Sequence, residues 1–413
     1  MQVTNKLKNI TKFVLFINAF AIEAVFRARS IADKSIDLQV IIKMGIWVLT
    51  FMFCIGSFKL WGRKLLRIDN ICLFMLLILI TASCFYAPDF LYSAAAAFSL
   101  FSIIFLMLMV SEVLDNREML LPIIYGCTLV MAISIVVYFV NPDFGRMKDW
   151  DGGQLVMTRR LTGIAGNANT AGYISAICLL TLYYYREYIP GRLPMRYWLC
   201  VVINFATLLM SNSRTSLMAL FISIGIAGLM KPFPARLAAI FGCICVAMLF
   251  IFAVQLNWIN IDALFALVAR SGSASEIESG TGRTAIWAVV IEMIHQRPFF
   301  GWGYGSTTKL IPEASAQVGF TADHAHNALL QVGVSVGLVG LALFITVIFT
   351  KLFYSVRSGV QLNVAFIVFL LIDGLTEPIA FQGVATTTTL ALATVLALNY
   401  GKENASSNRS YQQ

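Results

Sequence analysis

Three polar side chains that lie far apart in the sequence are of types that could bind a phosphate group and move a proton beside it. Arg214 lies in a serine-rich run, Arg283 follows Thr281-Gly282, and His326 precedes a long apolar segment. Arginine presents a planar set of N–H donors that fits phosphate oxygens, and a neutral histidine can act as a general base. Each residue alone is equally well explained as an arginine at the lipid surface or a histidine at a helix start. Taken together, they favour a functional site.

Arg283 opens a segment with helical periodicity that ends near Gln296. An arginine in the first helical turn is opposed by the helix dipole, but the free N–H groups of that turn would stabilise an anion. We therefore expect an amphipathic helix at the membrane surface with a phosphate site at its start. The apolar positions recur at intervals of three and four residues, and they are Ile286, Val289, Val290, Met293 and Ile294.

Signals for a metal or a cofactor are weak, and we predict neither. Asp149 and Asp151 form an Asp-x-Asp pair that could bind a divalent cation, but a solvated turn explains them better. All eight cysteines lie in or beside apolar segments, where they act as small core residues. The run Gly301-Trp302-Gly303-Tyr304-Gly305 lacks the strand–loop–helix setting of a dinucleotide site, so it predicts a tight turn.

The composition determines what kind of fold must position these residues. Of 413 residues, 59% are hydrophobic and 12% are charged, whereas soluble domains carry about 25% charged residues. A soluble globule, a disordered chain and a disulfide scaffold are thereby excluded. The net charge of +9 does not indicate nucleic-acid binding, because no soluble basic domain is present. Membrane topology and an anionic lipid-linked partner explain it better.

We predict an all-α, multi-pass membrane protein with about 12 transmembrane helices of about 20 residues each. Residues 1–400 would form one transmembrane domain and residues 401–413 a polar cytoplasmic tail. The expected spans are residues 10–26, 40–58, 71–87, 91–110, 119–140, 171–185, 197–209, 215–230, 237–256, 327–350, 362–375 and 384–400.

The distribution of lysine and arginine predicts the orientation. With the N-terminus inside, the short inside segments hold most of these residues, as the positive-inside rule requires. Both termini would then be cytoplasmic, and Arg214, Arg283 and His326 would share the outer face. Two outer connections are long, residues 141–170 and residues 257–325, and the second is large enough to hold surface helices.

The second half of the chain resembles the O-antigen ligase and O-antigen polymerase superfamily of polytopic glycan transferases. The resemblance covers about residues 163–350, and no comparable signature is found in the first five predicted spans. The matching pieces follow the family's order: residues 163–172 with Asn167 and Asn169, residues 211–216 around Arg214, residues 282–287, residues 298–305, and residues 326–330 followed by Gly337 and Gly340.

This resemblance implies an active site at the periplasmic face of the bacterial inner membrane. The donor would be a glycan on undecaprenyl diphosphate, and membrane lipids would surround the protein. His326 would activate an acceptor hydroxyl, and Arg214 and Arg283 would clamp the diphosphate. Arg159 or Arg160 would add donor contacts. The transfer would be metal-independent and would invert the anomeric carbon.

Three functions remain open, all tied to polysaccharide biosynthesis. A ligase transfers the O-antigen to a lipid A–core hydroxyl of lipopolysaccharide, and a polymerase transfers it to another lipid-linked repeat unit. We favour the ligase because no second large arginine-rich outer loop is available. A transporter or flippase would show internal symmetry and broken helices, which the sequence does not. Glu23, Lys43, Asp373 and Glu377 lie near outer span ends, and we expect them to pair with one another or with Arg214.

Overall fold

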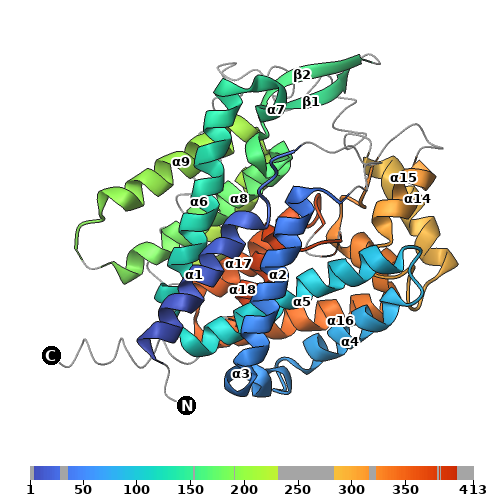
Figure 1. Ribbon diagram of the computed structural model, residues 1–413, viewed down its shortest axis with the longest axis horizontal. Coiled ribbons are helices and arrows are strands. Elements are labelled where there is room, and N and C mark those ends of the chain that lie inside the picture. Colours follow the sequence, from blue (N-terminus) through green and yellow to red (C-terminus); the bar gives the residue numbers. More distant parts are fainter. Residues whose placement is uncertain are drawn as a thin grey trace.

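The computed structural model describes residues 4–27, 36–151, 154–189, 191–230, 283–315, 322–378, 381 and 383–397. This part of the chain is a bundle of helices with one short hairpin (Figure 1). The first half consists of α1 (Asn5–Ala21), α2 (Leu38–Gly56), α3 (Phe58–Leu65), α4 (Ile71–Cys84), α5 (Phe90–Val113), α6 (Asn116–Val140), α7 (Pro142–Gly145), β1 (Arg146–Asp151) and β2 (Gln154–Leu161). The second half consists of α8 (Ala168–Tyr185), α9 (Met195–Ser211), α10 (Arg214–Gly228), α14 (Arg283–Gln296), α15 (Thr307–Ser315), α16 (Ala328–Ser358), α17 (Gln361–Asp373) and α18 (Thr387–Ala397).

The core of the bundle lies around α5 and α6. Helix α5 packs against α2 and α18, and α6 packs against α1 and α8. Successive residues of α5 from Leu106 to Met109 are all buried, so this helix is enclosed by protein on every side. Helix α2 instead exposes Leu49 and Met52, as a helix does when one face meets lipid.

Four helices among the described residues are long and apolar enough to cross a membrane, namely α2, α5, α6 and α16. Shorter apolar helices, including α4, α9 and α10, accompany them. Each predicted span coincides with a helix except residues 237–256, which lie outside the described residues. The prediction of a largely helical membrane protein is thus confirmed, while the number of spans and their orientation remain predictions.

The sequence predicts an all-α fold, but the structure also contains one β-hairpin. Strands β1 and β2 pair antiparallel, with Trp150 opposite Leu155, and lie beyond one end of α6 (Figure 1). The intervening Gly152-Gly153 is a dipeptide that two-residue hairpin turns favour. The hairpin occupies the first of the two long connections, which the prediction had left without regular structure.

Helix α16 is broken at Gly337, where φ is 71° and ψ is −174°. The backbone around the break bonds to the segment that follows α14: the N–H of Leu338 donates to the Pro298 carbonyl at 2.7 Å, and the N–H of Trp302 donates to the Val334 carbonyl at 2.9 Å. A Cβ on residue 337 would lie 2.2 Å from the Phe299 carbonyl oxygen, so only glycine permits this approach. The backbone N–H and C=O groups that the break frees are therefore hydrogen-bonded by another segment of the protein. Non-helical backbone within a membrane requires such partners.

The helix predicted from Arg283 to Gln296 is present as α14. It buries Ile286, Val290 and Met293, which belong to the predicted apolar stripe, in a small second core shared with α15 and the start of α16. Figure 1 shows α14 and α15 together at one side of the bundle. The start of α14 is thereby held near the N-terminal end of α16, where His326 lies.

Candidate functional site

The carboxylate of Glu377, just beyond α17, is the centre of a buried polar cluster. Its Oε1 atom accepts hydrogen bonds from Asn169 Nδ2 at 2.7 Å and from Arg283 Nη2 at 3.1 Å. Its Oε2 atom lies 3.6 Å from His326 Nδ1 and 3.7 Å from His324 Nε2. We call these five residues the Glu377 cluster. They come from α8, from the start of α14, and from the segments before α16 and after α17.

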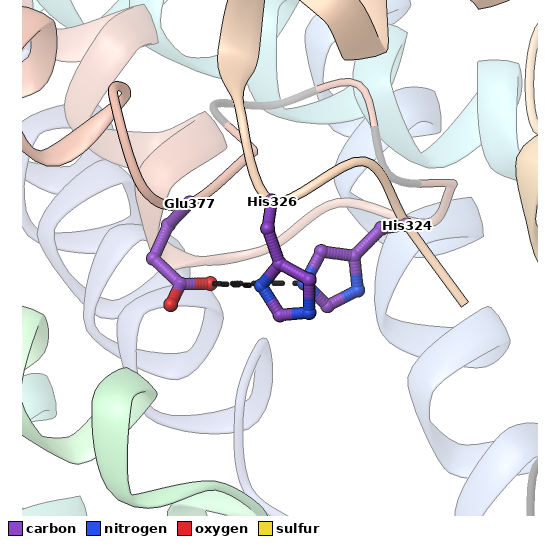
Figure 2. Close-up of side chains that lie close together, drawn as sticks. All are labelled: His324, His326 and Glu377. Atoms are coloured by element: carbon purple, nitrogen blue, oxygen red, sulfur yellow. Dashed lines mark ion pairs between the residues drawn. The ribbon is translucent and has the colours of Figure 1, made fainter. Parts of the chain in front are cut away.

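Both imidazoles point at the same carboxylate and lie side by side, as Figure 2 shows. Their ring centroids are 4.0 Å apart. His324 Nε2 and His326 Nδ1 are buried and have no hydrogen-bond partner among the described residues, and both atoms face Glu377 Oε2.

The position of His326 depends on the way the chain enters α16. Asn327 caps that helix by accepting from the N–H groups of Leu329 at 3.0 Å and Leu330 at 3.1 Å. His326 itself has a φ of 46°, a left-handed conformation that costs a non-glycine residue about 1 kcal/mol. This backbone conformation turns the chain sharply before the helix. Strained backbone of this kind is concentrated at functional sites.

Arg160 is joined to the cluster through Asn169. The Asn169 side chain accepts from Arg160 Nη2 at 2.7 Å while its amide group donates to Glu377. Arg160 is 6% exposed, and its Nε atom donates to the Ser211 carbonyl at 3.0 Å. One amide therefore connects a buried arginine on β2 with the central carboxylate.

The side chain of Arg159 points to the opposite face of β2 from that of Arg160. Successive residues of a strand point to opposite faces, and the Arg159 side chain is exposed while that of Arg160 is buried. The Arg159 carbonyl accepts from the Tyr138 hydroxyl at 3.0 Å. Of the two candidate arginines, Arg160 contacts the cluster through Asn169, and Arg159 lies at the surface.

Arg214 is the first residue of α10 and is half-buried. The segment before it borders the cluster, because the Ser211 carbonyl holds Arg160. Two residues after it, Ser216 donates to Asp373 at 3.1 Å. Gly172 allows this segment to approach α8, since a Cβ there would lie 2.2 Å from Ser213 Cβ. Arg214 thus begins its helix next to the cluster.

The two histidines of the cluster have pKa values that are shifted in opposite directions. Burial lowers the pKa of His324, but its contacts with Asp323 and then Glu377 raise that pKa to about 9. Burial lowers the pKa of His326, and the charge of His324 lowers it further against the opposing effect of Glu377. Burial would raise the pKa of Glu377, yet the two histidines hold it well below its usual range. At neutral pH the cluster therefore has an ionised Glu377, a protonated His324 and a neutral His326.

Two histidines and a carboxylate are also ligand types that suit a divalent metal. The ligand atoms of His324, His326 and Glu377 lie within 4.8 Å of one another. A metal would have to displace the proton of His324 and share Glu377 with Arg283, so these contacts favour a proton-handling site. The predicted absence of a metal and a cofactor remains a prediction. Asp149 and Asp151 lie in β1, and their side chains are outside the described part of the structure.

The sequence analysis did not identify the central role of Glu377, or any role for His324. Glu377 was noted as an acid near a span end, with an expected partner among Lys43, Asp373, Glu23 and Arg214. The cluster instead pairs it with Arg283. Glu23 accepts from the Tyr173 hydroxyl and the Thr387 N–H, both at 2.7 Å, and neither of these partners was expected from the sequence.

These features define a helical membrane protein in which a buried carboxylate holds an arginine and two histidines together. Residues 199–345 match the model of the family described as O-antigen ligase, in agreement with the resemblance found in the sequence. The match includes Arg214, Arg283 and His326, whereas Arg160, Asn169 and Glu377 lie outside it. Among curated proteins, none matches the chain. The family fits a membrane glycosyltransferase of the ligase or polymerase type, acting on lipid-linked glycans.

Proposed function

We propose that the protein is an O-antigen ligase: it transfers a glycan from undecaprenyl diphosphate to a lipid A–core hydroxyl. The observation that carries this proposal is that Arg283 and His326 contact one carboxylate, Glu377. A phosphate-binding side chain and a neutral base are thereby held next to each other. The family match at residues 199–345 supports the same reaction class.

In the proposed reaction the acceptor hydroxyl oxygen attacks the anomeric carbon of the donor sugar. His326 takes the hydroxyl proton as the new C–O bond forms. The bond between the anomeric carbon and the diphosphate oxygen breaks, and the diphosphate leaves with the electron pair. Attack from the face opposite the leaving group inverts the anomeric configuration.

The arginines stabilise the negative charge that develops on the leaving diphosphate. Arg283 and Arg214 are the proposed clamp, and Arg160 orients the cluster through Asn169. A guanidinium has five N–H donors, so Arg283 can contact both Glu377 and a phosphate oxygen. Because cationic side chains supply the charge stabilisation, the proposed reaction needs no metal.

The proposed location is the bacterial inner membrane, with both termini cytoplasmic and the Glu377 cluster facing the periplasm. The excess of lysine and arginine in the segments assigned to the inside supports this orientation. Lipid-linked donor and lipid A–core acceptor would then meet at the same membrane face.

Two other functions are alternatives. A polymerase would use the same cluster but take a second lipid-linked repeat unit as the acceptor. A transporter or flippase is favoured by one observation, the broken helix α16 at Gly337. That break is filled by residues 298–303 instead of lining a cavity, which argues for a structural role.

The decisive experiment is reconstitution of the full chain with a lipid-linked glycan and two acceptors, lipid A–core and a second lipid-linked unit. A product on lipid A–core, formed equally in the presence of EDTA, would support the proposal. A product on the second lipid-linked unit alone would establish a polymerase. Movement of the donor between leaflets with no product would establish transport.

A further inference from the structure

A second polar pocket lies at the far end of α8 from the Glu377 cluster. It is formed where the starts of α6 and α9 meet the end of α8. Arg117 and Arg196 line it together with Tyr125, Tyr185 and Tyr197, and the remaining lining is largely apolar. The pocket shares no residue with the proposed transfer site.

The length of α8 separates this pocket from the Glu377 cluster. Asn169, in the cluster, lies in the first turn of α8, and Tyr185 is its last residue. At about 1.5 Å per residue, the 18 residues of this helix extend about 27 Å. This distance is close to the hydrocarbon thickness of a bilayer, about 30 Å. We therefore infer that the pocket and the cluster lie toward different leaflets.

The pocket is lined by two arginine side chains, Arg117 and Arg196. Neither Arg117 nor Arg196 forms an ion pair within the part of the chain that the structure describes. The acids at the start of α6 are engaged elsewhere, because Asp115 caps the helix and Glu118 pairs with Lys8 at 2.9 Å and Lys12 at 2.7 Å. The two guanidinium groups thus form a site for an anion.

The surroundings favour an anion that carries acyl chains. On α9, next to Arg196, three large apolar side chains are exposed: Met195 at 83%, Trp198 at 50% and Leu199 at 56%. Tyrosine and tryptophan at a helix end are typical of the lipid–water interface. We propose that this pocket binds the phosphate headgroup of an anionic glycerophospholipid, whose acyl chains lie along the exposed face of α9. Basic pockets between membrane helices bind lipid headgroups by the same charge pairing.

The test uses the full chain purified in detergent and the double variant Arg117→Gln/Arg196→Gln. The control Arg192→Gln/Arg357→Gln removes the same charge from exposed arginines that do not line the pocket. Phosphatidylglycerol, phosphatidylcholine and inorganic phosphate are added separately, and lipid retention is read by native mass spectrometry with the thermal unfolding midpoint alongside.

We expect the wild type and the control to retain phosphatidylglycerol and to be stabilised by it, with no such effect of phosphatidylcholine. The double variant should bind phosphatidylglycerol about tenfold more weakly or worse. Its unfolding midpoint in phosphatidylcholine shows whether it is folded, and the two single variants replace it if it is not. Equal retention by the pocket variants and the control would overturn the proposal, and so would equal stabilisation by inorganic phosphate.

Discussion

Arg283 and Glu377 form a 3.1 Å ion pair between two chain segments that are 94 residues apart. Arg283 stands at the start of α14, where the helix dipole opposes a cation, and the carboxylate of Glu377 compensates this unfavourable placement. The same carboxylate faces both histidines of the cluster. The pair therefore connects the proposed phosphate clamp with the proposed base, and most of the predictions below test that connection.

His326→Ala should reduce glycan transfer by about 10²-fold or more, because general-base catalysis contributes about 10²–10⁴. Its amount in the membrane should not change. The matched control is His295→Ala, since His295 lies exposed near the end of α14. Turnover measured with a lipid-linked donor checks both variants, and full activity of His326→Ala would remove this residue from the mechanism.

Glu377→Gln should lower transfer by about tenfold or more, because Arg283 and His324 lose their common counter-charge. It should also move the acid limb of the pH–rate profile to lower pH, since Glu377 opposes the lowering of the His326 pKa. A purely structural effect would leave that limb in place. Glu292→Gln is the control, because the exposed Glu292 contacts Gln296 on the same helix at 3.3 Å.

Arg283→Lys and Arg214→Lys should each impair transfer by about tenfold, because lysine keeps the charge but loses the planar fork that holds phosphate oxygens. The measurement is kcat and KM for the lipid-linked donor in reconstituted vesicles. If lysine supports normal kinetics at both positions, the diphosphate clamp is wrong.

Arg160→Ala should cost about 2 kcal/mol of unfolding free energy, because it leaves the buried Ser211 carbonyl and Asn169 side chain without their donor. The neighbouring variant Arg159→Ala should change stability by less than about 0.5 kcal/mol, as exposed side chains usually do. Thermal unfolding of the two purified variants gives the comparison, and a reversed order would contradict the assignment of Arg160 to the cluster.

Transfer should depend on pH with two limbs. The acid limb should lie below pH 6.5, because the pKa of His326 is lowered from 6.5 and the base must be neutral. The alkaline limb should fall near pH 9, where His324 loses its proton. In His324→Gln the alkaline limb should disappear and the acid limb should move to higher pH, because the charge that lowers the His326 pKa is gone. A profile unchanged by His324→Gln would refute the proposed coupling.

The raised pKa of His324 also makes the stability of the fold depend on pH. The folded pKa of His324, about 9, lies above its ordinary value of 6.5. Its contacts with Asp323 and Glu377 therefore stabilise the fold fully below pH 6.5, and this contribution is lost as the pH rises through 9. The unfolding midpoint of the wild type should fall over that range more than the midpoint of His324→Gln.

Much of the helical framework was predictable, because apolar runs and helical periodicity are local properties of the sequence. The helix from Arg283 to Gln296 was predicted to its ends, and its buried side chains belong to the predicted stripe. The β1–β2 hairpin was not predicted, although Gly152-Gly153 between strand-forming residues signals such a turn. The composition of the whole chain had favoured helices everywhere.

The candidate site was only partly predictable. Arg283 and His326 were identified from their residue types and shared membrane face, and Asn169 from a resemblance. The partner of Glu377 was not identified from the sequence, because spacing along the chain does not reveal which distant segment a carboxylate will contact. Arg159 and Arg160 could be separated only once β2 was known, because the alternation of a strand decides which of the two is buried.

The order of the cluster residues along the chain has a consequence for biogenesis. Asn169, Arg283, His324 and His326 are all synthesised before Glu377, which follows α17 near the end of the described chain. A nascent chain that has already inserted the other four still lacks the carboxylate that joins them. Assembly of the site therefore coincides with the insertion of the last helices, and a partly made protein at the translocon holds its donor-binding groups unjoined until that moment.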